Sequence, residues 1–128
     1  MLIRNATIYT AVAPEPFVGD VRVCNGKILA VGPNLEAPGE PVVDATGLNL
    51  YPGFVEAHGH IGLDGYGIGF EGMDYNEPGD PVTPQLRGID GVKALDPAFG
   101  MAAAAGVTCV ATGPGSANVL GGTFTALK

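Results

Sequence analysis

The sequence has few of the residues that bind nucleic acid or cross-link small secreted domains. It has no tryptophan, two cysteines, two histidines and six lysines and arginines against thirteen aspartates and glutamates. The formal net charge of −7 argues against nucleic acid or an anionic membrane as a partner, because both would repel the chain. Cys24 and Cys109 lie far apart in separate apolar runs, so we expect two buried free thiols and no disulfide framework.

Long apolar runs are missing as well. No stretch approaches the roughly 18 to 20 apolar residues of a membrane-spanning helix. Arg4 and Asn5 interrupt the N-terminal apolar run, which also lacks the cleavage site of a signal peptide. We therefore expect a soluble cytoplasmic protein. Hydrophobic residues make up 46% of the chain and charged residues 15%, a balance that supports a packed core and argues against disorder.

Residues 1–51 have the pattern of short strands separated by turns. Apolar or alternating runs occur at residues 2–9, 21–24, 27–31, 42–43 and 48–51. Asn25-Gly26 stands between two of these runs and predicts a type I′ hairpin, a turn in which both central residues need positive φ. The pattern indicates a small antiparallel β unit.

The pattern changes at Pro52. Residues 54–61 form a predicted strand that ends in histidines, and residues 62–95 form a long stretch rich in glycine, proline and aspartate. Loops of this length in a compact domain are usually functional or mobile.

A helix and two strand-like runs complete the chain. Asp96 and Pro97 are suited to the N-cap and first position of a helix, and Gly106 is suited to its end. Strand-like runs follow at residues 107–111 and 123–127. The alternation of strands and a helix after Pro52 predicts a parallel α/β sheet with right-handed crossovers.

The two histidines, His58 and His60, are separated by one glycine. Alternate residues of a strand point to the same face, so both imidazoles are expected to project together. Two neutral imidazoles aimed at one point form half of a zinc-type site. Glu56 lies on the same face and is a candidate to hydrogen-bond a ligand histidine. A bare His-x-His pair on a strand is more often two ordinary surface or core histidines than a metal site, so its context matters.

That context resembles the amidohydrolase superfamily. The resemblance rests, in chain order, on the Asn25-Gly26 hairpin, the turn Asp44-Ala45-Thr46-Gly47 and the run Pro52-Gly53-Phe54-Val55-Glu56-Ala57-His58-Gly59-His60. Gly106-Val107-Thr108 fits the family's second barrel strand, and residues 113–118 and 121–128 are similar to the subgroup related to imidazolonepropionase. Members of the family usually have aspartate in place of Glu56.

The resemblance implies a fold and an activity. Residues 1–51 would belong to the family's β-sandwich domain, and residues 52–128 would begin a TIM-type (β/α)8 barrel. A whole barrel needs about 250 residues, so the barrel is incomplete in this chain. The implied activity is hydrolysis of a C–N bond in a small amide or cyclic amide by a metal-activated water. His58 and His60 would be the first two ligands of one or two divalent ions, most simply zinc, and the general base would lie beyond Lys128.

Three further residues are candidates for contact with metal or substrate. Lys128 ends the last strand-like run and is a candidate carboxylated lysine bridging two ions. Asp64 lies in the loop after the histidines, and Asn118 follows the second barrel strand. A solvated loop carboxylate and a plain tight turn are the alternatives for the last two.

Two other interpretations account for the short length. In the first, the chain is a non-catalytic metal-binding or assembly module, because two histidines are fewer than the three protein ligands of a catalytic zinc. In the second, it is an inactive truncated fragment. A barrel cut after about three strands would expose strand edges, so it would aggregate, form a homo-oligomer or require a complementing C-terminal chain.

Overall fold

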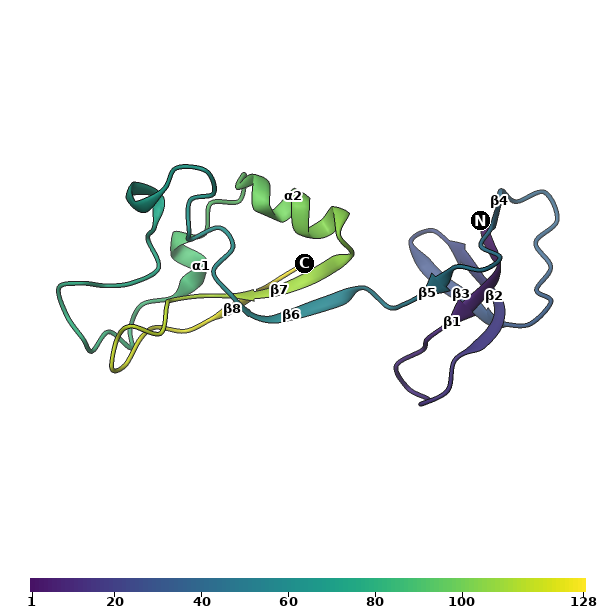
Figure 1. Ribbon diagram of the computed structural model, residues 1–128, viewed down its shortest axis with the longest axis horizontal. Coiled ribbons are helices and arrows are strands. Elements are labelled where there is room, and N and C mark those ends of the chain that lie inside the picture. Colours follow the sequence, from purple (N-terminus) through teal and green to yellow (C-terminus); the bar gives the residue numbers. More distant parts are fainter. The chain divides into compact units, whose positions relative to one another are not determined.

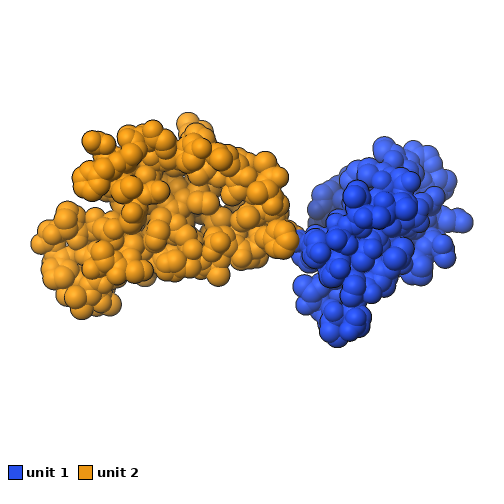
Figure 2. Space-filling model, viewed as in Figure 1, with its two compact units in different colours: residues 1–52 blue, residues 53–128 orange.

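The computed structural model describes all of residues 1–128 and divides them into two compact units (Figure 1). The first unit is Met1–Pro52 and the second is Gly53–Lys128, coloured separately in Figure 2. None of the helices has the length and apolar character needed to cross a membrane.

The first unit is a mixed five-stranded sheet. Its strands are β1 (Leu2–Ile8), β2 (Phe17–Cys24), β3 (Lys27–Gly32), β4 (Val42–Asp44) and β5 (Asn49–Leu50). The β1–β2 and β2–β3 pairs are antiparallel, but β4 and β5 both pair with β1 in parallel. The expectation of a wholly antiparallel unit is therefore wrong for these two strands. The β2–β3 hairpin and residues 33–41 together form the long crossover that parallel pairing with β1 requires.

The turn between β2 and β3 is the predicted hairpin. Asn25 and Gly26 have φ values of 49° and 71°, as this turn requires. Cys24 ends β2 beside this turn and is exposed, whereas Cys109 is half-buried, and both are free thiols. The expectation that both thiols are buried is wrong, because Cys24 lies at the end of its strand and outside the apolar cluster of the unit.

The core of the first unit lies where β1, β2 and the turn after β4 meet. Its buried members are Ala6, Ile8, Val21 and Ala45. Beside this cluster the buried carboxylate of Asp20 accepts hydrogen bonds from the backbone N–H groups of Asn5 and Leu35, each at 2.9 Å. Asn5 has a φ of 61° and lies at an irregularity in the β1–β2 register. Asp20 therefore holds a bulge of β1 and the loop after β3 in place.

The Asp44-Ala45-Thr46-Gly47 turn leads from β4 into β5. The carboxylate of Asp44 accepts hydrogen bonds from the hydroxyl of Thr46 at 2.6 Å and from its backbone N–H at 3.0 Å. These bonds, that of the hydroxyl foremost, lower the pKa of Asp44. Gly47 has a φ of 77°, which glycine adopts without strain. The chain then passes through β5 and Pro52 to the second unit.

The second unit is built on a three-stranded sheet in the order β6-β7-β8. Its elements are β6 (Phe54–Gly59), η1 (Phe70–Gly72), α1 (Gly88–Gly91), α2 (Pro97–Ala104), β7 (Val107–Thr112) and β8 (Thr125–Leu127). β6 and β7 are parallel, and α2 lies in the connection between them and contacts β7 (Figure 1). β8 is antiparallel to β7, so the expectation of a parallel strand is wrong there. Residues 113–124 contain no crossover helix, and the chain turns directly back.

Helix α2 begins and ends as predicted. The side chain of Asp96 accepts a hydrogen bond from the N–H of Ala98, Pro97 is the first helical residue, and Gly106 has a φ of 90°. None of the residues of α2 is buried, and the buried hydrophobic residues of this unit are Leu63 and Val110. The second unit therefore leaves much of its apolar surface exposed.

Glu40 connects two parts of the first unit. Its carboxylate accepts a hydrogen bond from Nε of Arg22 at 2.9 Å and another from the Met1 ammonium at 2.8 Å. The bonds from Arg22 and the ammonium lower the pKa of Glu40 from 4.5 to about 2.

This pKa predicts how the first unit responds to acid. Because the folded-state pKa is lowered, the contribution of Glu40 is complete above pH 4.5 and is lost as the pH falls through about 2. We expect the free energy of unfolding, measured by urea denaturation at several pH values, to fall in this window. Glu40→Gln should remove that part of the fall, whereas Glu36→Gln, at an exposed position nearby, should not. An unchanged acid dependence in Glu40→Gln would contradict this assignment.

Candidate metal centre

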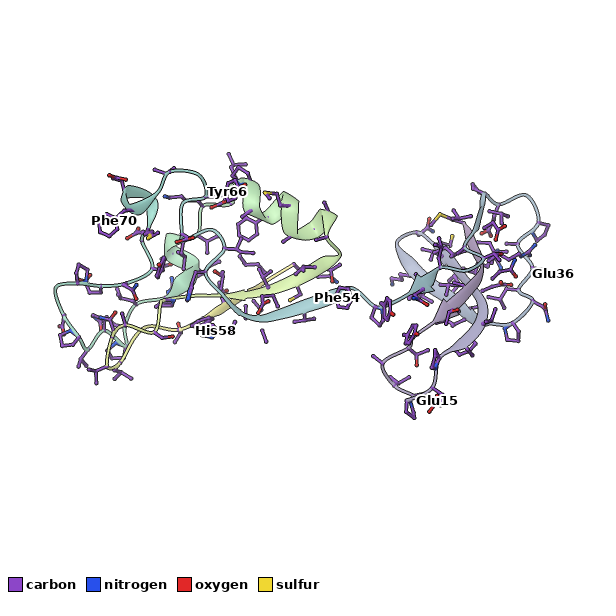
Figure 3. All side chains as sticks on the ribbon, in the orientation of Figure 1. Glu15, Glu36, Phe54, His58, Tyr66 and Phe70 are labelled. Atoms are coloured by element: carbon purple, nitrogen blue, oxygen red, sulfur yellow. The ribbon has the colours of Figure 1, made fainter.

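The two histidines lie together at the end of β6. The pairing of β6 with β7 runs as far as Gly59 opposite Thr112, so His58 lies in the strand and His60 directly follows it. The centroids of the two imidazole rings are 5.5 Å apart, and the ring planes meet at 81°. Figure 3 shows His58 at this end of β6. The two rings gather at one place, as the spacing of the residues predicts.

The ring of His60 has a defined hydrogen bond. Its Nδ1 lies 2.7 Å from the carbonyl oxygen of Gly113, in the turn after β7. A carbonyl oxygen only accepts hydrogen bonds, so Nδ1 carries the proton, and in the neutral imidazole Nε2 then has the lone pair. Metal-ligating histidines in proteins almost always have this arrangement, with the second ring nitrogen bonded to a carbonyl or carboxylate.

Two aromatic side chains flank the histidines. The ring of Tyr75, from the long loop, stacks on His60 with centroids 4.9 Å apart and an interplanar angle of 13°. The ring of Phe124, just before β8, lies 4.9 Å from His58. Neither residue can be identified from the sequence, because no local pattern connects them with the histidines.

A cavity of about 260 Å³ opens beside His60. Its lining includes Asp64, Tyr66, Tyr75 and Asp96. The carboxylate of Asp96 is engaged in capping α2 and is buried, whereas Asp64 is exposed. The structure therefore places Asp64 on the same cavity as His60, and Figure 3 shows Tyr66 in the loop that follows β6.

The carboxylate of Glu56 contacts the backbone of a histidine. Its Oε1 accepts a hydrogen bond from the N–H of His58 at 3.0 Å. The predicted contact was with an imidazole ring. In this geometry Glu56 restrains the main chain at His58, two residues before His60.

Asn118 and Lys128 lie further from the histidines. The side-chain amide of Asn118 donates to the carbonyl oxygens of Glu77 at 2.7 Å and Asp80 at 3.0 Å, which ties the long loop to the turn after β7. Leu127 pairs with Val110, and Val110 pairs with Glu56, so β8 carries Lys128 toward the beginning of β6. There Lys128 borders an apolar groove between α2 and β7.

The histidine pair meets part of the requirement for a metal site. A catalytic zinc takes three protein ligands, and residues 1–128 bring together no group of three or more His, Cys, Asp or Glu side chains that could hold an ion. The two imidazoles are adjacent, and His60 has an oriented Nε2. They fit two positions of a ligand shell.

Comparison with known proteins shows the family. No protein-family model matches the chain. Amidohydrolase tasK from Hapsidospora irregularis is 38% identical over 141 residues, an alignment that covers 94% of this chain and 14% of tasK. The crystal structure of an amidohydrolase from Thermotoga maritima MSB8 is 49% identical, with a TM-score of 0.88, over 99% of this chain and 33% of that one. The chain belongs to the amidohydrolase superfamily.

The relatives extend well beyond the matched region. The D-hydantoinase from Geobacillus stearothermophilus is 39% identical over 48% of this chain and 13% of its own length. The chain thus spans a third or less of the length of these three relatives. The relatives do not specify a subgroup, and the similarity to imidazolonepropionase stays a prediction.

Thr112, at the end of β7, holds the chain directly after His60, and this contact predicts an effect on stability. Thr112 is fully buried, and its hydroxyl donates to the carbonyl oxygen of Ile61 at 2.7 Å. Thr112→Val keeps the shape and removes the donor, so we expect a loss of about 1–3 kcal/mol in the free energy of unfolding. Thr108→Val, at an exposed position of the same strand, should change it by less than about 0.5 kcal/mol. Urea denaturation measures both variants, and equal losses would refute a specific role for the Thr112 hydroxyl.

Proposed function

We propose that His58 and His60 are the first two ligands of a divalent metal in an enzyme that hydrolyses a C–N bond of an amide or cyclic amide. The main support is the pair of imidazoles at the end of β6, with Nδ1 of His60 bonded to a carbonyl. The membership of the chain in a family whose relatives are named amidohydrolase and hydantoinase supports the reaction class. Zinc is the most suitable ion, because neutral imidazole is among its preferred ligands.

The residues of this chain would orient the metal centre. When bound, a metal lowers the pKa of a coordinated water to about 7 and polarises the scissile carbonyl. The Gly113 carbonyl orients the ring of His60, and Glu56 restrains the backbone at His58. The cavity beside His60, with the exposed Asp64 on its wall, is the proposed place for a small-molecule substrate. The remaining ligands and the general base are proposed to come from outside residues 1–128.

We also propose that the second unit is part of a (β/α)8 barrel. The parallel β6 and β7, joined through α2, have the connectivity of one repeat of such a barrel. Val55 of β6 is 67% exposed and Met101 of α2 is 55% exposed, which is unusual for apolar residues of a barrel strand and its helix. Further strands, from the same chain, a complementing C-terminal chain or a second copy, would cover this surface.

A second candidate function is a non-catalytic metal-binding or assembly module. It is favoured by the absence, within residues 1–128, of any group of three or more His, Cys, Asp or Glu side chains that could hold a metal ion. The two functions differ in whether the native-length protein hydrolyses any amide.

The ligand assignment predicts the effect of replacing either histidine in the native-length protein. His58→Ala and His60→Ala should each lose most bound zinc, measured by elemental mass spectrometry after gel filtration. Hydrolysis of linear and cyclic amides should fall by more than about 100-fold, because even the loss of an outer-shell partner costs 10- to 100-fold. Glu71→Gln, which changes an exposed carboxylate of η1 in the long loop after His60, is the control. Normal zinc and activity in His58→Ala would exclude His58 as a ligand, and a zinc-loaded protein without hydrolase activity would favour the second candidate function.

A further inference from the structure

The turn after β7 contacts the histidine site at three points. The carbonyl of Gly113 accepts a hydrogen bond from Nδ1 of His60, and the N–H of Gly113 donates to the carbonyl of Gly59 at 3.3 Å. The N–H of Gly115 donates to the carbonyl of Tyr75 at 2.6 Å. The same short turn therefore holds the residue before His60, the ring of His60 and the backbone of the tyrosine that stacks on that ring.

Both glycines of this turn are required by close packing. A Cβ atom on Gly113 would lie 2.6 Å from the ring of Phe124 and 2.9 Å from its Cα. A Cβ atom on Gly115 would lie 2.3 Å from the side-chain oxygen of Asn76 and 2.6 Å from the ring of Tyr75. The turn is thus packed directly against the two aromatic residues that flank the histidines.

Tyr75 contacts His60 through its ring. The nearly parallel rings, 4.9 Å apart, leave His60 little freedom to rotate about its side-chain bonds. The hydroxyl of Tyr75 points to the sulfur of Met73 at 3.7 Å and contacts no group of the metal centre. Tyr75 therefore restrains the ring of His60 through its aromatic ring and not through its hydroxyl.

We propose that Tyr75 is a positioning residue that, together with the Gly113 carbonyl, fixes His60 in the Nδ1–H tautomer with Nε2 available to a metal. This inference rests on the proposed function and deepens it, because the assignment of His60 as a metal ligand belongs to that proposal. The tautomer itself is a property of the chain alone. A ring fixed in this way binds a metal without first having to change tautomer or rotate, which raises affinity.

The test reads the tautomer directly by NMR. The native-length protein, freed of metal with a chelator, is labelled with ¹⁵N-histidine, and two-bond ¹H–¹⁵N correlation spectra are recorded in mildly alkaline buffer, where imidazoles are neutral. The wild-type chain and Tyr75→Phe should both show His60 as a single Nδ1–H tautomer. Tyr75→Leu, which removes the aromatic ring, should show a second tautomer for His60. The spectra of His58, whose ring does not stack on Tyr75, provide the internal reference.

A second variant moves Tyr75 without replacing it. Gly115→Ala places a methyl group against the ring of Tyr75 and should also produce a second His60 tautomer, so it carries the test if Tyr75→Leu fails to fold. Gly121→Ala is the matched control in the same connection, because its Cβ would meet Pro114 at an ordinary 3.7 Å. A mixed tautomer in the wild-type chain, or an unchanged single tautomer in folded Tyr75→Leu and Gly115→Ala, would overturn the proposal.

Metal binding gives an independent readout in the native-length protein. Zinc affinity, measured by competition with a chromogenic chelator, should fall about 10- to 100-fold in Tyr75→Leu and stay near the wild-type value in Tyr75→Phe. Equal affinities in the two variants would contradict positioning by the ring. If the His60 tautomer depends on Tyr75 but His58→Ala and His60→Ala retain zinc and activity, the proposed function fails while the structural role of Tyr75 stands.

Discussion

The parallel pairing of β6 with β7 is the constraint on which the candidate site depends. It places the end of β7 beside the end of β6, with Gly59 opposite Thr112, and so brings the turn at Gly113 to His60. The buried hydroxyl of Thr112 then holds the main chain at Ile61, directly after that histidine, and the carbonyl of Gly113 holds its imidazole ring. Without this register the imidazole of His60 would have no fixed partner.

Local signals in the sequence predicted the parts of the fold that depend on neighbouring residues. Asn25-Gly26 forms its hairpin, and Asp96, Pro97 and Gly106 begin and end α2, because each acts on backbone groups a few residues away. The histidine spacing predicted the meeting of the two rings for the same reason. Strand direction was predicted less well. β4 and β5 are parallel to β1 and β8 is antiparallel to β7, opposite to expectation, because the direction of pairing depends on the long-range path of the chain.

The residues that contact the histidines could not be predicted from the sequence. Gly113 is 53 residues from His60, and its role is carried by a backbone carbonyl that every residue possesses. Tyr75 lies in a long irregular stretch, where no periodicity indicates which face of the chain points inward. Asn118 was named as a possible substrate contact, yet both of its amide bonds go to loop carbonyls. The sequence indicates which residue types have suitable chemistry, whereas the contacts follow from the long-range packing.

The attachment of the long loop to the β7–β8 connection has a consequence for how the protein tolerates insertions and deletions. Val82 and Arg87 form parallel bridges with Leu120 and Thr123. Just before Val82, the carbonyl oxygens of Glu77 and Asp80 accept hydrogen bonds from Asn118. A change of length near residues 82–87 would therefore pull on Phe124, which packs on Gly113 and His58. The segment around Phe70, which is 83% exposed, has no such connection to the strands. In divergence within a family, length variation should accumulate around Phe70, while residues 82–87 vary by substitution alone.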